Sequence, residues 1–485
     1  MRAHSGRTDT GHVVVIGGGI AGLAAAHRLL DQGVRVTVLE ASGRLGGKLL
    51  PGEIAGARVD LGAESMLARR PEAVGLAREV GLADRLQPPA TATASIWTRG
   101  ALRPMPKGHV MGVPGTAAAL SGVLSEEGLH RIEREVDLPR TEVGDDVAVG
   151  EYVAARLGRE VVDRLVEPLL GGVYAGDAYR ISMRAAVPQL FEAARTHASL
   201  TEAVRAVQAR AAAAQQTGPV FTGIEGGIGR LPLAVAESVR ARGGEIRLNS
   251  PVHGLRCTPE GWEVMVDDSV EEADGVVVAV PAARAATLLR AEAPAAAAEL
   301  AEVEYASMAL ITLAYRRADA VLPEGSGFLV PPVDGHTIKA STFASRKWGW
   351  IDAENPDLLV LRTSVGRYGE TEVLGRDDED LVEVSRHDLQ AAVGLAAAPV
   401  ATRVTRWTDG LPQYPVGHHA RVARIREHVG KLPGLAVCGA AYDGVGIPAC
   451  IASAYAAVDQ LRGDRGGLDA LRANPVQSLH GGAGE

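Results

Sequence analysis

The residues with the clearest chemical meaning are three glycines spaced as Gly17-x-Gly19-x-x-Gly22 near the start of the chain. They follow a short β-branched run at 12–16 and open an apolar stretch over 20–32 that is typical of a helix. In such a turn the first glycine permits the sharp bend, the second lets the backbone approach a pyrophosphate, and the third lets helix and strand pack closely. The positive end of the helix would then face the phosphates. The pattern predicts a dinucleotide site built from Gly17, Gly18, Gly19, Ile20, Ala21 and Gly22.

An acidic residue stands where the ribose of a dinucleotide would lie. Glu40 comes 18 residues after Gly22, at the end of a second predicted strand over 35–40. A carboxylate there accepts hydrogen bonds from both ribose hydroxyls and disfavours a 2′-phosphate, which argues against NADP as the ligand. Strand, helix and strand together predict a βαβ unit at the N-terminus.

The rest of the chain must complete this sheet and add a layer for the substrate. Residues 70–215 are mainly helical by periodicity, with amphipathic segments at Glu72–Glu79, Ser125–Glu135, Val149–Leu170 and Leu200–Ala214. Residues 302–410 alternate with period two, which predicts an antiparallel sheet with helical insertions. A last strand, a glycine-rich turn and a helix are expected from Leu435 to about Leu461.

We therefore expect a fold that is α/β plus α+β, with a Rossmann-like cofactor domain, a mixed-sheet substrate domain and a helical insertion domain. The expected ranges are 12–90, 216–285 and 421–463 for the cofactor domain, 91–215 for the helical domain and 286–420 for the sheet domain, with flexible tails at 1–11 and 464–485.

Composition excludes several classes of protein. With 50 basic and 59 acidic residues among 485, the net charge is −9, which argues against a nucleic-acid binder. The three cysteines, Cys257, Cys438 and Cys450, are far apart and show no metal-ligand spacing, so we expect no disulfide framework, no metal site and a reducing compartment. The most apolar early stretch, 12–30, holds a glycine run, His27 and Arg28, which is unlike a membrane span.

Beyond the first turn, the segment from Glu40 to Lys48 resembles the ExxxRxGG signature of FAD-binding oxidoreductases, including the amine-oxidase and porphyrinogen-oxidase group. Two further segments are similar to that group: 225–232, with the GG…LP pattern, and 439–448, which opens the last helix. The resemblance implies non-covalently bound FAD, with the last helix directed at the flavin. Besides the first-turn residues and Glu40, the cofactor-binding residues it implies are Ala41, Arg44, Gly47, Lys48, Gly62, Ala63, Glu64, Ser65, Val252, Trp407, Gly439, Val445, Gly446 and Ile447. For Trp407, packing on the flavin edge and packing on the neighbouring Pro/Tyr turn remain open.

Further segments bring the resemblance to one family, the protoporphyrinogen/coproporphyrinogen III oxidases. They are Asp60–Leu67, Pro168–Asp177, Lys347-Trp348, the stretch from Trp407 to His418, and Gly444–Ile451, in an order that spans 12 to about 462. The resemblance implies oxygen-dependent oxidation of coproporphyrinogen III to coproporphyrin III in haem biosynthesis, with release of H2O2. The flavin would carry this chemistry, so no catalytic side chain is assigned, and His418 and His419 are expected in loop or packing roles.

The anionic substrate requires a cation at its site. Arg70 is expected to grip a propionate of the porphyrinogen, and the alternative is a solvated residue at the start of the next helix. Tyr174 is expected to line the macrocycle.

Several alternatives remain open. The substrate could be protoporphyrinogen IX, or the chain could be another flavin amine oxidase, a desaturase or a non-enzymatic escort protein on the same fold. Only 18 aromatic residues occur, with Tyr442 and Tyr455 alone near the last glycine-rich turn, which is a poor supply for an amine-oxidase cage. We expect a cytoplasmic protein whose membrane contact is at most peripheral, through 110–215. Hand-over of the product to a downstream haem-pathway enzyme is left open.

Overall fold

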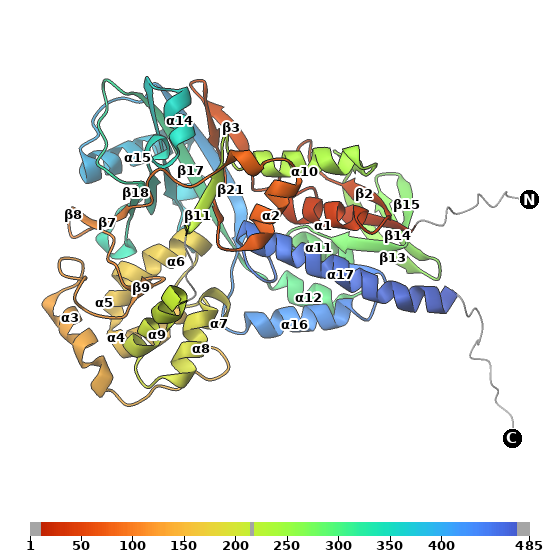
Figure 1. Ribbon diagram of the computed structural model, residues 1–485, viewed down its shortest axis with the longest axis horizontal. Coiled ribbons are helices and arrows are strands. Elements are labelled where there is room, and N and C mark those ends of the chain that lie inside the picture. The colour runs from red at the N-terminus through yellow and green to blue at the C-terminus, as the bar shows by residue number, and fades with distance from the viewer. Residues whose placement is uncertain (1–10, 214–217, 473–485) are drawn as a thin grey trace, which may run out of the picture.

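The computed structural model describes residues 11–213 and 218–472. A five-stranded parallel sheet, in the right half of Figure 1, has the strand order β12-β2-β1-β16-β22. β1 (His12–Ile16) pairs with β2 (Arg35–Leu39) on one side and with β16 (Gly275–Val278) on the other. α1 (Ile20–Leu30) connects β1 to β2, which confirms the predicted βαβ unit. The outer strands are β12 (Glu245–Arg247) and β22 (Leu435–Val437).

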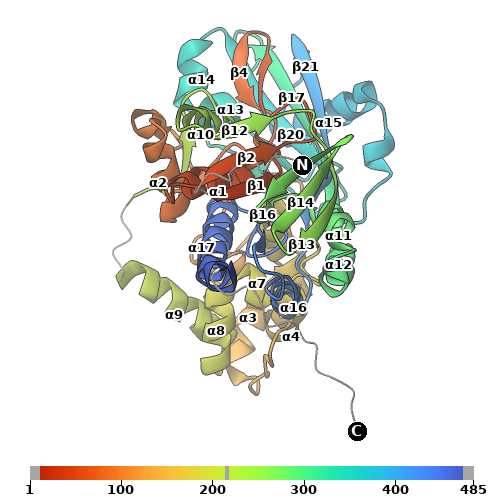
Figure 2. The same ribbon diagram turned by 90° about the vertical axis from the view of Figure 1, so that its right-hand side faces the viewer.

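Both faces of this sheet are buried, as its β-branched strands require. Val13 and Val15 pack into a core with α1, α10 (Arg230–Ala241) and α17 (Ile447–Arg472). Val14 and Ile16 face a second core on the opposite side. That core is built from β13 (Val252–Thr258), β14 (Gly261–Val266), β15 (Ser269–Ala273), α11 (Ala282–Leu289), α12 (Pro294–Ala301) and α16 (His418–Val429). Figure 2 shows β13, β14, α11 and α12 on the side of the sheet away from α17.

A second sheet has seven strands in the order β21-β17-β20-β19-β18-β7-β8. Its strands are β7 (Ala94–Thr98), β8 (Ala101–Pro104), β17 (Tyr305–Arg316), β18 (Gly327–Leu329), β19 (Ala340–Thr342), β20 (Leu358–Val365) and β21 (Ala401–Pro412), with α13 (Ala344–Lys347), α14 (Gly349–Glu354) and α15 (Asp378–Val393) inserted. The sheet expected over 302–410 is therefore present. It also takes β7 and β8 from the range that we assigned to the helical domain, because β7 pairs in parallel with β18, more than 200 residues away.

Helices form a third layer, at the lower left of Figure 1. They are α3 (Glu126–Glu133), α4 (Val149–Leu157), α5 (Arg159–Val161), α6 (Glu167–Tyr174), α7 (Met183–Ala186), α8 (Pro188–Thr196) and α9 (Leu200–Ala213). The helix expected over Val149–Leu170 is interrupted. Gly158, with φ +91°, ends α4, and a π-helical turn at Val162–Val166 leads into α6.

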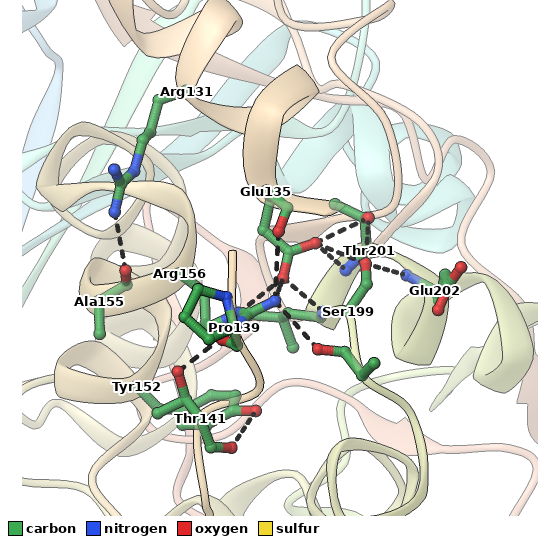
Figure 3. Close-up of polar contacts among 12 residues, drawn as sticks. Arg131, Glu135, Pro139, Thr141, Tyr152, Ala155, Arg156, Ser199, Thr201 and Glu202 are labelled. Atoms are coloured by element: carbon green, nitrogen blue, oxygen red, sulfur yellow. Dashed lines mark hydrogen bonds and ion pairs between the residues drawn. The ribbon is translucent and has the colours of Figure 1, made fainter. Parts of the chain in front are cut away.

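A buried ion pair holds this layer together (Figure 3). Glu135 and Arg156 are 0% and 1% exposed, and the Arg156 Nε donates to the Glu135 carboxylate at 2.7 Å. The same carboxylate accepts from the Ser199 hydroxyl at 2.5 Å and from the Leu200 N–H at 2.7 Å, at the start of α9. The Arg156 guanidinium also donates to the carbonyls of Pro139 and Ala198. One carboxylate therefore fixes both α9 and α4.

The smaller elements connect the three layers. β3 (Pro51–Ile54) and β4 (Ala57–Asp60) form a hairpin, while β5 (Met66–Leu67), β6 (Leu86–Gln87) and β11 (Phe221–Ile224) form a short sheet beside α2 (Pro71–Glu79). α17 continues to Arg472, so the tail expected from residue 464 is wrong for 464–472. The tails expected at 1–10 and 473–485 lie outside the described residues. Within the described ranges, no helix has the length and apolar composition needed to cross a bilayer.

Candidate cofactor and substrate site

The first glycine turn has the geometry of a phosphate-binding turn. Gly17 has φ +111°, and a Cβ there would lie 2.5 Å from the Ala279 carbonyl oxygen. A Cβ at Gly22 would lie 1.9 Å from the Gly17 carbonyl oxygen, so α1 can approach β1 only without a side chain. A Cβ at Gly19 would meet no described atom within 4 Å, and no side chain caps α1 there. The turn thus leaves an open face at the N-terminus of α1, where the N–H groups of Ile20 and Ala21 begin the helix.

Glu40 lies beside this turn at the end of β2. Its carboxylate accepts hydrogen bonds from the Gly18 N–H at 2.7 Å and from the Ser42 N–H and hydroxyl at 2.8 and 2.7 Å. These donors fix the orientation of the carboxylate, and its remaining lone pairs can accept from ribose hydroxyls. The open glycine turn and the fixed carboxylate fit a dinucleotide.

The Arg44–Lys48 segment folds back against the first turn. The Gly46 N–H donates to the Gly18 carbonyl at 2.9 Å, and Gly19 and Gly46 form a parallel bridge. The exposed Arg44 guanidinium donates to the Gly47 carbonyl at 2.8 Å, which closes its own turn. Lys48 is half-buried, and burial lowers its pKa. This arrangement brings the predicted residues Arg44, Gly47 and Lys48 to the same place as the glycine turn, while Ala41 lies exposed beside them.

The segment 60–65 is held from several sides. A Cβ at Gly62 would lie 2.1 Å from the Lys48 carbonyl oxygen and 3.1 Å from the Trp407 ring, so only glycine fits there. Trp407 donates from Nε1 to the Leu61 carbonyl at 3.0 Å. The Arg362 guanidinium donates to the Gly62 carbonyl at 2.8 Å. Trp407 thus packs on Gly62, a contact that neither alternative for this residue included.

Glu64 is a buried carboxylate with two cationic partners. Lys347 Nζ lies 2.5 Å from one of its oxygens and Arg362 Nη2 lies 3.1 Å from the other. Burial alone would raise the pKa of Glu64, but the Arg362 guanidinium and the Lys347 ammonium lower it to about 2. Because both oxygens are engaged, Glu64 positions the segment that also holds Ala63 and Ser65. A direct contact between Glu64 and a cofactor stays a prediction.

The last glycine-rich turn follows β22 and opens α17 at Ile447. Gly439 and Gly444 have φ +126° and +153°, and Gly446 accepts the first helical hydrogen bond from the Cys450 N–H at 3.0 Å. Val445 packs against the core of the helical layer. Burial raises the pKa of the Cys450 thiol to about 12, so this cysteine is a neutral, buried group.

Val252 begins β13, two residues after Ser250, whose N–H donates to the Glu40 carbonyl at 2.9 Å. The Val252 side chain is 3% exposed, and its carbonyl accepts a hydrogen bond from the Arg284 guanidinium at 2.6 Å. Contact between the Val252 backbone and an adenine stays a prediction.

Aromatic residues join the last turn to the helical layer. The Tyr414 hydroxyl donates to the Ala440 carbonyl, and the Tyr414 ring lies 5.8 Å from that of Tyr174. His418 stacks on Tyr414 with a centroid distance of 4.0 Å, and burial lowers its pKa to about 4. A neutral, stacked imidazole has the packing role that we expected for His418, whereas His419 is exposed.

Arg70 lies just before α2 with its side chain 45% exposed. Its guanidinium is 2.6 Å from the Glu72 carboxylate, so it is already paired two residues along the chain. Tyr174 is buried, and its carbonyl accepts from the Gln413 amide at 3.0 Å. The roles of Arg70 and Tyr174 in substrate binding stay predictions.

Sequence reasoning missed Arg362, Lys339 and Arg367. The last two line a hollow between α6 and the seven-stranded sheet. One signal was available: lysine occurs at only five positions, and three of these, Lys48, Lys339 and Lys347, are buried or half-buried in this region. The other two lysines, Lys107 and Lys431, are exposed.

The chain was compared with known proteins. The family model described as "Flavin containing amine oxidoreductase" matches residues 20–462. A coproporphyrinogen III oxidase of Mycobacterium tuberculosis is 39% identical over 455 residues, which cover 92% of this chain and 96% of the relative. One of Bacillus subtilis is 32% identical over 461 residues, covering 92% and 97%. A crystal structure of a candidate protoporphyrinogen oxidase from Exiguobacterium sp. 255-15 is similar with a TM-score of 0.83 at 32% identity, covering 94% of this chain and all of that one.

Proposed function

Because the chain belongs to the family of flavin-containing amine oxidoreductases, we propose that it oxidises coproporphyrinogen III to coproporphyrin III with non-covalently bound FAD. The observation that carries this proposal is the similarity to bacterial coproporphyrinogen III oxidases along 92% of the chain. The reaction removes six electrons and six protons from the macrocycle and reduces three O2 to three H2O2.

The residues of this chain would hold FAD in an extended groove. The open N-terminus of α1 at Gly19 would bind the pyrophosphate, and Glu40 would accept from the ribose. At the other end, Gly62 beneath Trp407 and the start of α17 at Ile447 would hold the flavin. Bound FAD supplies hydride acceptance and reaction with O2.

The protein then has to position the substrate and exclude competing chemistry. Glu64, paired with Lys347 and Arg362, keeps the Gly62 segment in place, and the three side chains together carry one net positive charge. His418 is neutral and stacked on Tyr414, which agrees with a reaction that needs no side-chain acid or base. Tyr174 would lie against the macrocycle.

An amine oxidase is a weaker reading of the same fold. Tyr442 is buried in the core on one face of the parallel sheet, whereas Tyr455 packs against the core on the opposite face. These two rings therefore cannot frame one substrate nitrogen. Protoporphyrinogen IX oxidation is the second candidate, favoured by the similarity to the Exiguobacterium structure.

One experiment separates these functions. The purified protein should be yellow, release FAD on denaturation, and turn over both porphyrinogens side by side, with porphyrin fluorescence and peroxide measured together. We expect a larger kcat/KM for coproporphyrinogen III and one H2O2 for each two electrons. A preference for protoporphyrinogen IX would favour the second candidate, and a colourless protein that cannot be reconstituted with FAD would contradict both.

We also propose a cytoplasmic location and hand-over of the product to a later enzyme of haem synthesis, which a pull-down from the source cytosol would test.

A further inference from the structure

A hollow lies between α6 and the strands β18 and β19, away from the glycine turns. It is lined by small residues of α6 and the following turn, such as Gly171 and Gly172, and by Val330 and Pro332 on the opposite side. Lys339 and Arg367 complete its wall. A Cβ at Gly172 would lie 3.8 Å from Leu329, at ordinary van der Waals distance.

The Lys339 ammonium is buried in this wall. The residue is 7% exposed, and its Nζ donates to the Gly366 carbonyl at 2.8 Å. Among the ion pairs of the described residues, none involves Lys339. Burying an ammonium without a counter-ion is unfavourable, and burial lowers the pKa of Lys339 to about 7.

The Arg367 guanidinium adds a second positive charge. It donates to the backbone carbonyls of Val330, His336 and Ile338 at 3.2–3.3 Å. Its carboxylate partner, Glu370, lies 3.5 Å away with its side chain 46% exposed. Backbone carbonyls orient this guanidinium without cancelling its charge.

The carboxylate that lines the hollow is weakly acidic. Glu167 accepts from the Ala178 N–H at 2.7 Å, and burial raises its pKa to about 7. The hollow is therefore lined by a guanidinium, by a lysine amine that is partly protonated near pH 7, and by a carboxyl group that is readily protonated. This balance fits a hollow that receives an anion.

The hollow is linked to the expected flavin site through β20. Along β20, Arg362 contacts the Gly62 carbonyl, and the chain reaches Gly366, the partner of Lys339, four residues later. Tyr174, at the end of α6, packs against Tyr414, whose hydroxyl donates to the Ala440 carbonyl in the last glycine-rich turn.

We propose that this hollow is a carboxylate-binding subsite in which Lys339 and Arg367 hold one propionate of the substrate. The inference rests on the proposed function, because it takes the anion to be a side chain of the porphyrinogen. It adds a second anchor, on the sheet domain, to the one expected at Arg70.

The test uses the full chain with bound FAD and the variant Lys339→Met, which keeps the length of the side chain and removes its charge. Binding of coproporphyrin III, followed by fluorescence quenching, should weaken about tenfold or more, the usual effect of losing a hydrogen bond to a charged group. Binding of coproporphyrin III tetramethyl ester, which lacks the carboxylates, should be the same in variant and wild type. Lys431→Met is the matched control, because Lys431 is an exposed lysine paired with Glu427.

A second variant should change the affinity for coproporphyrin III in the opposite direction. Glu167→Gln keeps the acceptor for the Ala178 N–H and removes the competing carboxylate, so it should tighten binding of coproporphyrin III. Three results would each overturn the subsite. They are unchanged binding of coproporphyrin III by Lys339→Met, an equal loss of affinity for coproporphyrin III and its tetramethyl ester, and weaker binding of coproporphyrin III by Glu167→Gln. If the wild-type protein binds neither porphyrin, both the proposed function and the subsite are overturned. If the wild-type protein binds coproporphyrin III and Lys339→Met binds it equally well, only the subsite is overturned.

Discussion

Arg156→Met should destabilise the helical layer strongly. The substitution removes the guanidinium that pairs with the fully buried Glu135 and leaves a carboxylate in a dry environment. Breaking a buried pair by removing one partner costs about 3–5 kcal/mol. The carbonyls of Pro139 and Ala198 lose their donor as well, which moves the expected loss towards the upper end of that range.

Thermal and urea unfolding measure this loss. For a cooperative unit of about 150–250 residues, a loss of about 4 kcal/mol lowers Tm by roughly 8–16 °C. Arg131→Met is the matched control from the same layer (Figure 3), because Arg131 donates only to the Ala155 carbonyl in an exposed position. Its effect should stay within about 0.5 kcal/mol.

The pH dependence gives a second readout of the same pair. Burial raises the pKa of Glu135, but the Ser199 hydroxyl, the Leu200 N–H and Arg156 together lower it below its ordinary value. The stability contributed by this carboxylate is therefore complete at neutral pH and is lost as the pH falls through the lowered pKa. In Arg156→Met the pKa should rise, so the difference in stability between variant and wild type should narrow as the pH falls. A decrease in the free energy of unfolding below about 1 kcal/mol at pH 7 would refute a strongly stabilising Glu135–Arg156 pair. A difference between variant and wild type that does not change with pH would refute it as well.

Three further predictions concern the candidate site. Gly22→Ala should abolish flavin content in the purified protein, because its Cβ would collide with the Gly17 carbonyl. The control Gly75→Ala should retain the flavin, because a Cβ at Gly75 meets no described atom within 4 Å. Glu40→Gln should weaken FAD binding about tenfold by removing a charged acceptor for the ribose, measured by titration of the apoprotein with FAD; unaltered affinity would count against the ribose contact. Arg70→Ala should raise KM for the porphyrinogen more than it lowers kcat, and steady-state assays that find KM unchanged would exclude the anchor.

The sequence was most informative where function depends on neighbouring residues. The turn at Gly17–Gly22 and the position of Glu40 depend on one βαβ unit, so spacing alone predicted their geometry. The last turn at 439–447 was predictable for the same reason, because its strand, glycines and helix are consecutive.

Features that depend on distant pairing were not visible in the sequence. Glu64 and Lys347 are 283 residues apart, so no local pattern could show that the carboxylate is engaged by cations. The strands β7 and β8 are short, and their membership of the second sheet is decided by a partner beyond residue 320. Within 149–174, amphipathic periodicity continues through Gly158 and the π-helical turn, so it could not reveal the break in the helix.

The parallel sheet is assembled from three distant parts of the chain, and this has a consequence for synthesis on the ribosome. The glycine turn at Gly17–Gly22 emerges first, but the edge strand Leu435–Val437 and the helix that follows it are made last. At about 5–20 residues per second, roughly 20 to 80 s separate the two events. During that time α1 lacks the α17 surface against which it packs in the native core, so apolar residues of the nascent domain remain without their final partner. The cofactor site is thus completed only near the end of translation, and the early βαβ unit has to be kept from aggregating until then.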